Sequence, residues 1–117
     1  MSKLDVRMVV LSTDDLDKSI AFYTDTLGMS VKFRDGARYA ALDGGSVTVA
    51  LATEIDHPLP GKVVVGIKTT DVDEATKAIE AGGGSIVKAP YNDAHERRAV
   101  VYDNMGNGLV FYSPLPH

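Results

Sequence analysis

The residues best suited to acid–base chemistry in this sequence are its three histidines, His57, His95 and His117. His95 lies between Asp93 and Glu96, and an imidazole paired with either carboxylate can act as a general base. Adjacent polar residues of this kind also occur in ordinary solvent-exposed loops, so both interpretations stay open. We expect His57 and His117 to be solvated and without a role. The chain has no cysteine, which excludes a thiolate nucleophile, a thiolate metal site and a disulfide.

Aromatic and basic side chains provide the next candidate group. Tyr39, Tyr91 and Tyr102 have flat faces with a polar tip, which suits stacking on a planar ligand, although one or two of them can instead close the core or a dimer contact. Arg97 and Arg98 begin a predicted strand, in which successive side chains point to opposite faces. We expect Arg98 to face the ligand, because it shares a face with Tyr102.

Lys68 is unusual because it ends an otherwise apolar predicted strand. Burying an unpaired ammonium group costs several kcal/mol, so Lys68 either extends into solvent or meets an anionic partner. If the protein is an enzyme, Lys68 is a second candidate acid or base beside His95.

The element that positions these residues is a predicted helix over Asp15 to Leu27. Leu16, Ile20, Tyr23 and Leu27 recur at steps of four, three and four, which places them on one helical face. We expect Thr13 or Asp14 to cap the first amides and Gly28 to end the helix in a left-handed conformation. Such a one-sided helix requires a sheet to pack against.

The same arrangement returns 56 residues later, where Asp71 matches Asp15. That offset also pairs Leu11 with Ile67, Thr13 with Thr69, Leu16 with Val72, Asp17 with Asp73, Gly28 with Gly84, Val31 with Val87 and Lys32 with Lys88. We therefore predict two copies of one strand–helix–strand unit, each followed by further strands. In the second copy, Asp71 and Glu74 form a variant of the capping box.

The chain is predicted to be a single domain, residues 1–117, with a first module over about 4–53, a link over about 54–61 and a second module over about 62–114. The other predicted helix is 72–81, and the predicted strands are 6–11, 29–33, 38–42, 46–52, 63–68, 85–88, 97–102 and 109–113. A polar loop is expected over 89–96. In the strand 46–52 we expect Val49 and Leu51 to lie under the helix and Thr48 and Ala50 to lie on the opposite face.

Composition limits the class of protein. The chain has 117 residues, 44% of them hydrophobic, which suffices for one compact core. The net charge is −4 and the twelve basic residues are scattered, so neither nucleic acid nor an anionic membrane is an expected partner. The first residues lack the apolar run of a secretory signal, and no stretch is long enough to cross a bilayer, so we expect a cytoplasmic protein.

The repeated βαβββ unit resembles the vicinal oxygen chelate superfamily, which includes glyoxalase I, bleomycin-resistance proteins and extradiol dioxygenases. The similarity lies in Asp-Leu-x-x-Ser-Ile-x-Phe-Tyr-x-x-x-Leu-Gly-Met from Asp15, in Asp-Val-Asp-Glu-Ala from Asp71 with the later Ala-Gly-Gly, and in the turn beginning at Asp103. The resemblance implies an α+β fold of two tandem βαβββ modules whose curled mixed sheet forms a cup, and a homodimer.

The resemblance also implies where a divalent metal would be held in the cup. Enzymes of the group use up to four ligands, one from the first and one from the last strand of each module. In this sequence those positions fall on Met8, Ala50, Val64 and Val110. A thioether is a poor ligand for such metals, and Ala and Val offer none, so we predict no metal and no other cofactor.

The expected cup is mostly apolar with a few polar groups, which is typical of a small-molecule site. Its predicted ligand-binding residues are Met8, Tyr39, Thr48, Ala50, Val64, Lys68, Tyr91, Arg98, Tyr102, Val110 and Tyr112. We expect a metal-independent protein that sequesters a hydrophobic or aromatic small molecule, with a role in antibiotic resistance as one use. The alternatives are a metal-free isomerase, cyclase or lyase, a metal-dependent glyoxalase- or dioxygenase-type enzyme, and an interaction module whose cup is filled by its own side chains.

Overall fold

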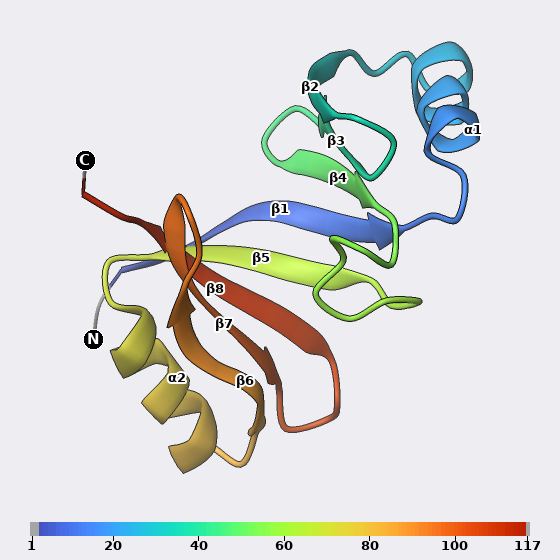
Figure 1. Cartoon of the computed structure of the whole chain (residues 1–117). Helices are drawn as coiled ribbons and strands as arrows, with labels where there is room; N and C mark the ends of the chain where they lie inside the picture. Colours follow the sequence, from blue (N-terminus) through green and yellow to red (C-terminus); the bar gives the residue numbers. More distant parts are fainter. Residues whose placement is uncertain (1–2, 117) are drawn as a thin grey trace. The chain divides into compact units, whose positions relative to one another are not determined.

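The computed structural model describes residues 3–116 and confirms the α+β fold class (Figure 1). The chain divides into two compact units. The N-terminal unit comprises residues 7–64, and the C-terminal unit comprises residues 65–116 together with residues 3–6. Each carries one βαβββ set, as the repeat predicts.

The N-terminal unit is a mixed four-stranded sheet with one short helix. Its elements are β1 (Leu4–Ser12), α1 (Leu16–Ala21), a π-helical turn η1 (Phe22–Thr26), β2 (Val31–Asp35), β3 (Tyr39–Asp43) and β4 (Thr48–Ala52). The strand order is β2-β3-β4-β1, with β1 parallel to β4 and the other neighbours antiparallel.

Helix α1 covers one face of this sheet. Leu16 is buried against Leu42 and Leu51, and Val49 packs against the same cluster, as predicted for that face of β4. The N-cap is Asp15 rather than Thr13 or Asp14, because its Oδ1 accepts the Lys18 amide at 3.1 Å.

The end of this helix differs from the prediction. The α-helix stops at Ala21, and the π-helical turn η1 follows. A π turn contains more residues than an α turn, so it rotates the residues after it off the buried stripe. Tyr23 still packs against the core, but Leu27 is 52% exposed and the expectation that it shares the buried face was wrong. Gly28 has φ 75°, the left-handed conformation expected at this position.

The C-terminal unit repeats this design with a longer helix. Its elements are β5 (Val64–Thr69), α2 (Val72–Ala81), β6 (Ser85–Asn92), β7 (Glu96–Tyr102) and β8 (Gly108–Pro114). The strand order is β5-β8-β7-β6, and Figure 1 shows α2 along one face of this sheet. The buried cluster under α2 consists of Val72, Ala75, Ala99, Val101 and Phe111.

The two helix starts have nearly identical backbones. Asp15 has φ −147° and ψ 96°, and Asp71 has φ −147° and ψ 94°. Asp71 accepts the Glu74 amide at 3.0 Å, which confirms the predicted cap. The paired glycines Gly28 and Gly84 serve different purposes: Gly28 has a positive φ, whereas a Cβ at Gly84 would lie 2.5 Å from the Tyr102 carbonyl oxygen.

The predicted loop over 89–96 is largely strand. β6 continues to Asn92 and β7 begins at Glu96, so Tyr91 and Glu96 lie in the sheet. β6 includes Pro90, and a proline, which has no N–H to donate, is tolerated there because β6 is the edge strand of its unit. The register shifts between Ile86 and Lys88 and again before Tyr91, which hid the alternating pattern.

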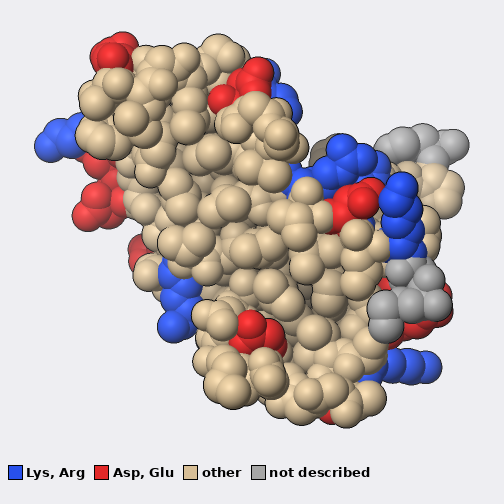
Figure 2. Space-filling model, turned by 180° about the vertical axis from the view of Figure 1, so that it is seen from behind, with Lys and Arg blue, Asp and Glu red and all other residues tan. Residues whose placement is uncertain are grey.

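No helix in residues 3–116 is both long enough and apolar enough to span a bilayer. On the face drawn in Figure 2, basic and acidic side chains lie intermingled, and much of the surface is uncharged.

Candidate functional site

The predicted site residues of the N-terminal unit lie on the sheet face opposite α1, called the helix-free face below. Strand pairing places Met8 beside Thr48, Val10 beside Ala50, and Ser12 beside Ala52. On the next strand Tyr39 pairs with Ala52. Met8, Tyr39, Thr48 and Ala50 therefore share one face, and it is the face that α1 leaves uncovered.

Two further side chains join this face that the sequence reasoning did not include. Lys32 Nζ donates to Thr48 Oγ1 at 3.1 Å, and the Phe33 ring centroid lies 6.4 Å from that of Tyr39. The bulge between Val31 and Phe33 allows these two neighbours to contribute to the same face. That bulge has no clear signal in the sequence.

The predicted residues of the C-terminal unit lie on its own helix-free face. Arg98 pairs with Tyr112 on β8 and with Tyr91 on β6. The next row toward Tyr102 is Lys88, Val100 and Val110, in which Val100 pairs with both neighbours. Lys88 Nζ lies 4.1 Å from the Tyr91 ring centroid, a cation–π contact.

The alternation of side chains along β5 shows on which face of the sheet the remaining predicted residues, Val64 and Lys68, lie. Ile67 packs against the cluster under α2, so Val64 and Lys68 point to the other face. Val64 and Val110 are fully or almost fully buried, whereas Lys68 is partly exposed.

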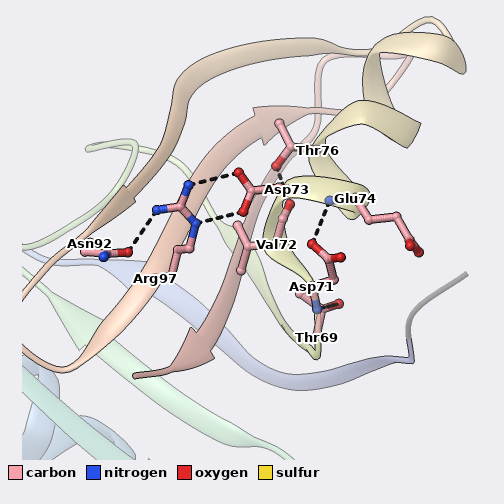
Figure 3. Close-up of polar contacts among 8 residues, drawn as sticks. All are labelled: Thr69, Asp71, Val72, Asp73, Glu74, Thr76, Asn92 and Arg97. Carbon is pink, nitrogen blue, oxygen red and sulfur yellow. Dashed lines mark hydrogen bonds and ion pairs between the residues drawn. The ribbon is translucent and has the colours of Figure 1, made fainter. Parts of the chain in front are cut away.

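The Arg97 side chain, on the face of β7 that is turned toward α2, shows how this strand is oriented. Arg97 Nε and Nη2 donate to the two carboxylate oxygens of Asp73 on α2 at 2.8 and 2.9 Å, and Nη1 donates to Asn92 Oδ1 at 2.9 Å (Figure 3). Hydrogen bonding from Arg97 lowers the pKa of Asp73, so the pair is charged at neutral pH. Because Arg97 points toward α2, Arg98 points to the helix-free face, as expected from the sequence.

The Arg98 side chain has few close hydrogen-bond acceptors within the described residues. Its Nη1 lies 3.9 Å from Asp93 Oδ2 and its Nε lies 3.8 Å from Glu96 Oε1, distances that are too long for hydrogen bonds. Nε is buried and donates to no atom of residues 3–116. The guanidinium group is therefore held near two carboxylates but keeps donor capacity.

Glu96 and Asp93 differ in their electrostatics. Burial raises the pKa of Glu96, and the nearby Arg98 charge opposes this only in part. Burial also tends to raise the pKa of Asp93, but hydrogen bonds from the His95 and Glu96 amides, each 2.8 Å from its Oδ1, hold it below its ordinary value. Asp93 thus orders the β6–β7 turn, and Glu96 is the more basic carboxylate. The sequence reasoning assigned Glu96 to a loop and so missed its place beside Arg98.

The two candidate catalytic residues occupy different surroundings. The His95 side chain is exposed in the β6–β7 turn, and its backbone carbonyl accepts the Leu115 amide at 2.9 Å. Lys68 is half-buried on the sheet face that carries Arg98. Their catalytic roles stay predictions.

His57 contradicts the expectation that it is solvated. It is only 5% exposed, its Nδ1 accepts the Leu59 amide at 2.9 Å, and its Nε2 lies 3.3 Å from the Val10 carbonyl oxygen. Burial lowers the pKa of this imidazole, although the hydrogen bonds to Val10 and Lys62 oppose that shift. His57 links the segment after β4 to β1, because its two ring nitrogens contact the Leu59 amide and the Val10 carbonyl group.

The N-terminal unit also contains two open clefts that the sequence did not indicate. One, of about 690 Å³, is lined by Ser12, Thr13, Asp14, Ser19, Glu54, Pro60 and Gly61. A second, of about 360 Å³, is lined by Thr13, Asp14, Ala37, Thr53, Glu54 and Ile55. The Ser12 hydroxyl in the larger cleft is already used, since it accepts the Gly61 amide at 3.0 Å and donates to the Lys62 carbonyl at 2.9 Å.

The four positions that the resemblance assigns to metal ligands do not fit a divalent metal. Met8 offers only a thioether, and Ala50, Val64 and Val110 offer no donor atom. Within residues 3–116, His, Asp and Glu form no group of three or more that could hold an ion.

Residues 6–111 match the Glyoxalase/Bleomycin resistance protein/Dioxygenase superfamily, and the chain belongs to that family. The resemblance stated from the sequence is thereby confirmed. An uncharacterised protein of Mycolicibacterium smegmatis is 75% identical over 115 residues, which cover 98% of each chain.

Solved structures support the same fold. A glyoxalase/bleomycin resistance protein/dioxygenase superfamily member from Vibrio splendidus matches with a TM-score of 0.74 and 20% identity, covering 97% of this chain and 99% of that one. The Mn(II)-bound glyoxalase from Novosphingobium aromaticivorans matches with a TM-score of 0.67 and 20% identity, covering 97% of this chain and 40% of that one. At these identities the comparison shows the fold and not the activity.

Proposed function

We propose that this protein binds a hydrophobic or aromatic small molecule without a metal ion and sequesters it. The observation that carries the proposal is the set of side chains at the metal-ligand positions, Met8, Ala50, Val64 and Val110, because none of them offers the oxygen or nitrogen donor that a divalent metal needs.

The rest of each helix-free face supports binding. In the C-terminal unit, tyrosines and one arginine surround valines, and in the N-terminal unit Phe33 and Tyr39 lie near small apolar residues. Apolar surface with a few placed polar groups is the usual composition of a small-molecule site, and tyrosine supplies contact area at low entropic cost.

Equilibrium dialysis against a panel of planar aromatic compounds, antibiotics included, tests the proposal on the whole chain. We expect at least one compound to bind with a dissociation constant in the micromolar range or tighter. Tyr112→Ala should weaken that binding, whereas Phe22→Ala, which removes an exposed aromatic ring on η1, should not. Retention of no compound above background would refute the proposal.

A second function, a metal-free isomerase, cyclase or lyase, is favoured by one observation. Glu96 is partly buried on the face of Arg98, and burial raises its pKa toward the range in which a carboxylate transfers protons efficiently. Turnover of a bound compound that is lost in Glu96→Gln, with binding retained, would establish the enzyme. Loss of turnover in Lys68→Ala or His95→Ala would instead assign the proton transfer to those side chains.

We further infer a homodimer and a cytoplasmic location, with antibiotic resistance as one use of sequestration. The dimer is supported by the edge strand β2, on which Val31 and Phe33 are exposed, Phe33 by 58%. Light scattering at micromolar concentration should give twice the 12.5 kDa chain mass. A monomer would contradict the dimer.

A further inference from the structure

The segment 53–62, which leads from β4 to β5, forms part of the wall of both clefts of the N-terminal unit. These residues belong to no helix or strand, so the clefts keep their shape only while tertiary contacts hold the segment in place. The lining residues that the segment supplies are Thr53, Glu54, Ile55, Pro60 and Gly61.

Near both of its ends the segment is held by hydrogen bonds whose groups do not titrate. The Thr53 amide donates to the Arg38 carbonyl oxygen at 3.0 Å, and the Ser12 hydroxyl group accepts the Gly61 amide at 3.0 Å. Between these two ends lies the ring of His57, which is only 5% exposed. The middle of the segment is therefore attached to β1 through a group that can take up a proton.

The hydrogen bonds of His57 require the neutral ring. Its Nδ1 accepts the Leu59 amide at 2.9 Å, so this nitrogen carries no proton, and the proton on Nε2 faces the Val10 carbonyl oxygen at 3.3 Å. A proton on Nδ1 would set two donors against each other and place a charge in a buried site. Protonation thus opposes the contact that attaches the middle of the segment.

Among the described residues, no charged side chain stabilises the protonated ring. The pKa of His57 is lowered by burial, and the groups that oppose this shift are the backbones of Val10 and Lys62. Strand β4 contains no ionisable side chain. The ionisable side chains on β1, beside it and on the segment are exposed or lie in ion pairs, and they are Asp5, Arg7, Asp14, Arg38, Glu54, Asp56 and Lys62.

We propose that His57 is a pH-sensitive switch: its neutral ring holds the segment 53–62 against β1, and protonation releases the segment and changes the walls of both clefts. The released ring has the ordinary pKa of 6.5 and the held ring a lower one. The held arrangement is therefore fully favoured above pH 6.5, and its advantage declines as the pH falls from there toward the lowered pKa.

Amide hydrogen exchange, followed by NMR on the whole chain, tests this switch without a variant. Rates at pH 7.5 and pH 5.5 are each divided by the intrinsic rate at the same pH. The informative amides are those of Leu59, Gly61 and Lys62, which are hydrogen-bonded within the segment or to β1. We expect their protection to fall severalfold, by up to about tenfold, at the lower pH.

Low concentrations of urea separate release of the segment from unfolding of the whole unit. Local release exposes little surface, so exchange of the three amides should hardly respond to urea below the unfolding transition. Exchange of the β4 amides, in the middle of the N-terminal sheet, should accelerate with urea because it requires more extensive unfolding.

His57→Asn keeps a side-chain oxygen acceptor in place of Nδ1 and cannot be protonated in this pH range. We expect it to retain protection of the Leu59 amide at pH 7.5 and to abolish the fall at pH 5.5. His95→Asn makes the same change at an exposed position and should leave the fall in place. Should His57→Asn not fold, the pH and urea comparisons on the unaltered protein still decide the matter.

Equal protection of the three amides at both pH values would overturn the inference. Exchange that responds to urea as steeply as that of β4 would also overturn it, since the segment would then open only with the whole unit. A fall in protection that survives in His57→Asn would assign the pH dependence to another group, which likewise contradicts the proposed switch.

Discussion

Arg97 on β7 and Asp73 on α2 are joined by two parallel hydrogen bonds of 2.8 and 2.9 Å. This bidentate pair links the first turn of α2 to β7, the strand that also carries Arg98. The third bond of Arg97, to Asn92, extends the tie to the end of β6. The pairing thus fixes which way two consecutive arginines point: one to the helix, the other to the candidate ligand face.

Replacing Arg97 with Gln should lower the melting temperature by a few degrees, because Asp73 and Asn92 lose a shared donor group. The pKa of Asp73 is lowered in the folded state, so the stabilisation is present above about pH 4, where the unfolded carboxylate is ionised, and is lost as pH falls through the folded pKa. Thermal melts between pH 3 and pH 7 should therefore show the two proteins converging in acid. Arg7→Gln, at an exposed position of β1, is the control, and an equal effect there would contradict this role.

The matching caps of the two helices permit a paired experiment. Asp71→Ala should destabilise the protein by about 1 kcal/mol and Asp71→Asn by much less, since asparagine still accepts the Glu74 amide. Asp15→Ala should behave in the same way through the Lys18 amide. Chemical denaturation measures both changes. If alanine and asparagine were equivalent at either position, the side chain would not be acting as a cap.

The repeat and the Asp71 cap could be predicted from sequence because they depend on local chemistry. At the first helix the same chemistry indicated a cap, but the prediction of Thr13 or Asp14 missed Asp15 by one or two residues. An aspartate before an apolar stripe, three residues ahead of an amide that needs an acceptor, specifies a helix start without knowledge of the remainder of the fold. The alternation that assigned Arg98 and Tyr102 to one face is local in the same sense, and the strand pairing bears it out.

The features that the sequence did not predict depend on tertiary context. The π-helical turn after Ala21 exposes Leu27 although its spacing fits an α-helix. Pro90 sits in a strand because that strand is an edge, and only the completed strand order shows this. His57 is buried because Val10, distant in sequence, offers a carbonyl to its ring.

His57 should make stability depend on pH. Its lowered pKa means that the folded state resists protonation, so its stabilisation is complete above pH 6.5, the ordinary value, and declines as the pH falls from there toward the folded pKa. His57→Leu should remove that part of the pH dependence and should cost about 1–3 kcal/mol at pH 8, because the buried Leu59 amide loses its acceptor.

Denaturation curves at several pH values between 8 and 5 give the comparison for His57. The exposed His95 provides the control, since His95→Leu should leave the difference between pH 8 and pH 5 in place. Should His57→Leu retain the pH dependence of the unaltered protein, the buried imidazole would not be its source.

Elemental analysis tests most directly the prediction that the protein functions without a bound metal ion. Protein purified without chelator or affinity metal should contain far less than one equivalent of zinc, nickel, manganese or iron, and EDTA should leave its melting temperature unchanged. The reason is the available donor atoms: Met8 offers a thioether and Ala50 a methyl group on the face where an imidazole and a carboxylate would be needed.

The double variant Met8→His/Ala50→Glu supplies an imidazole and a carboxylate from the neighbouring strands β1 and β4. It should be less stable than the unaltered protein, because a carboxylate replaces a buried methyl group, and zinc should restore part of the loss by binding only the folded state. Near-stoichiometric metal in the unaltered protein would mean that ligands come from other positions, and the chain would then belong with the metalloenzymes of its family.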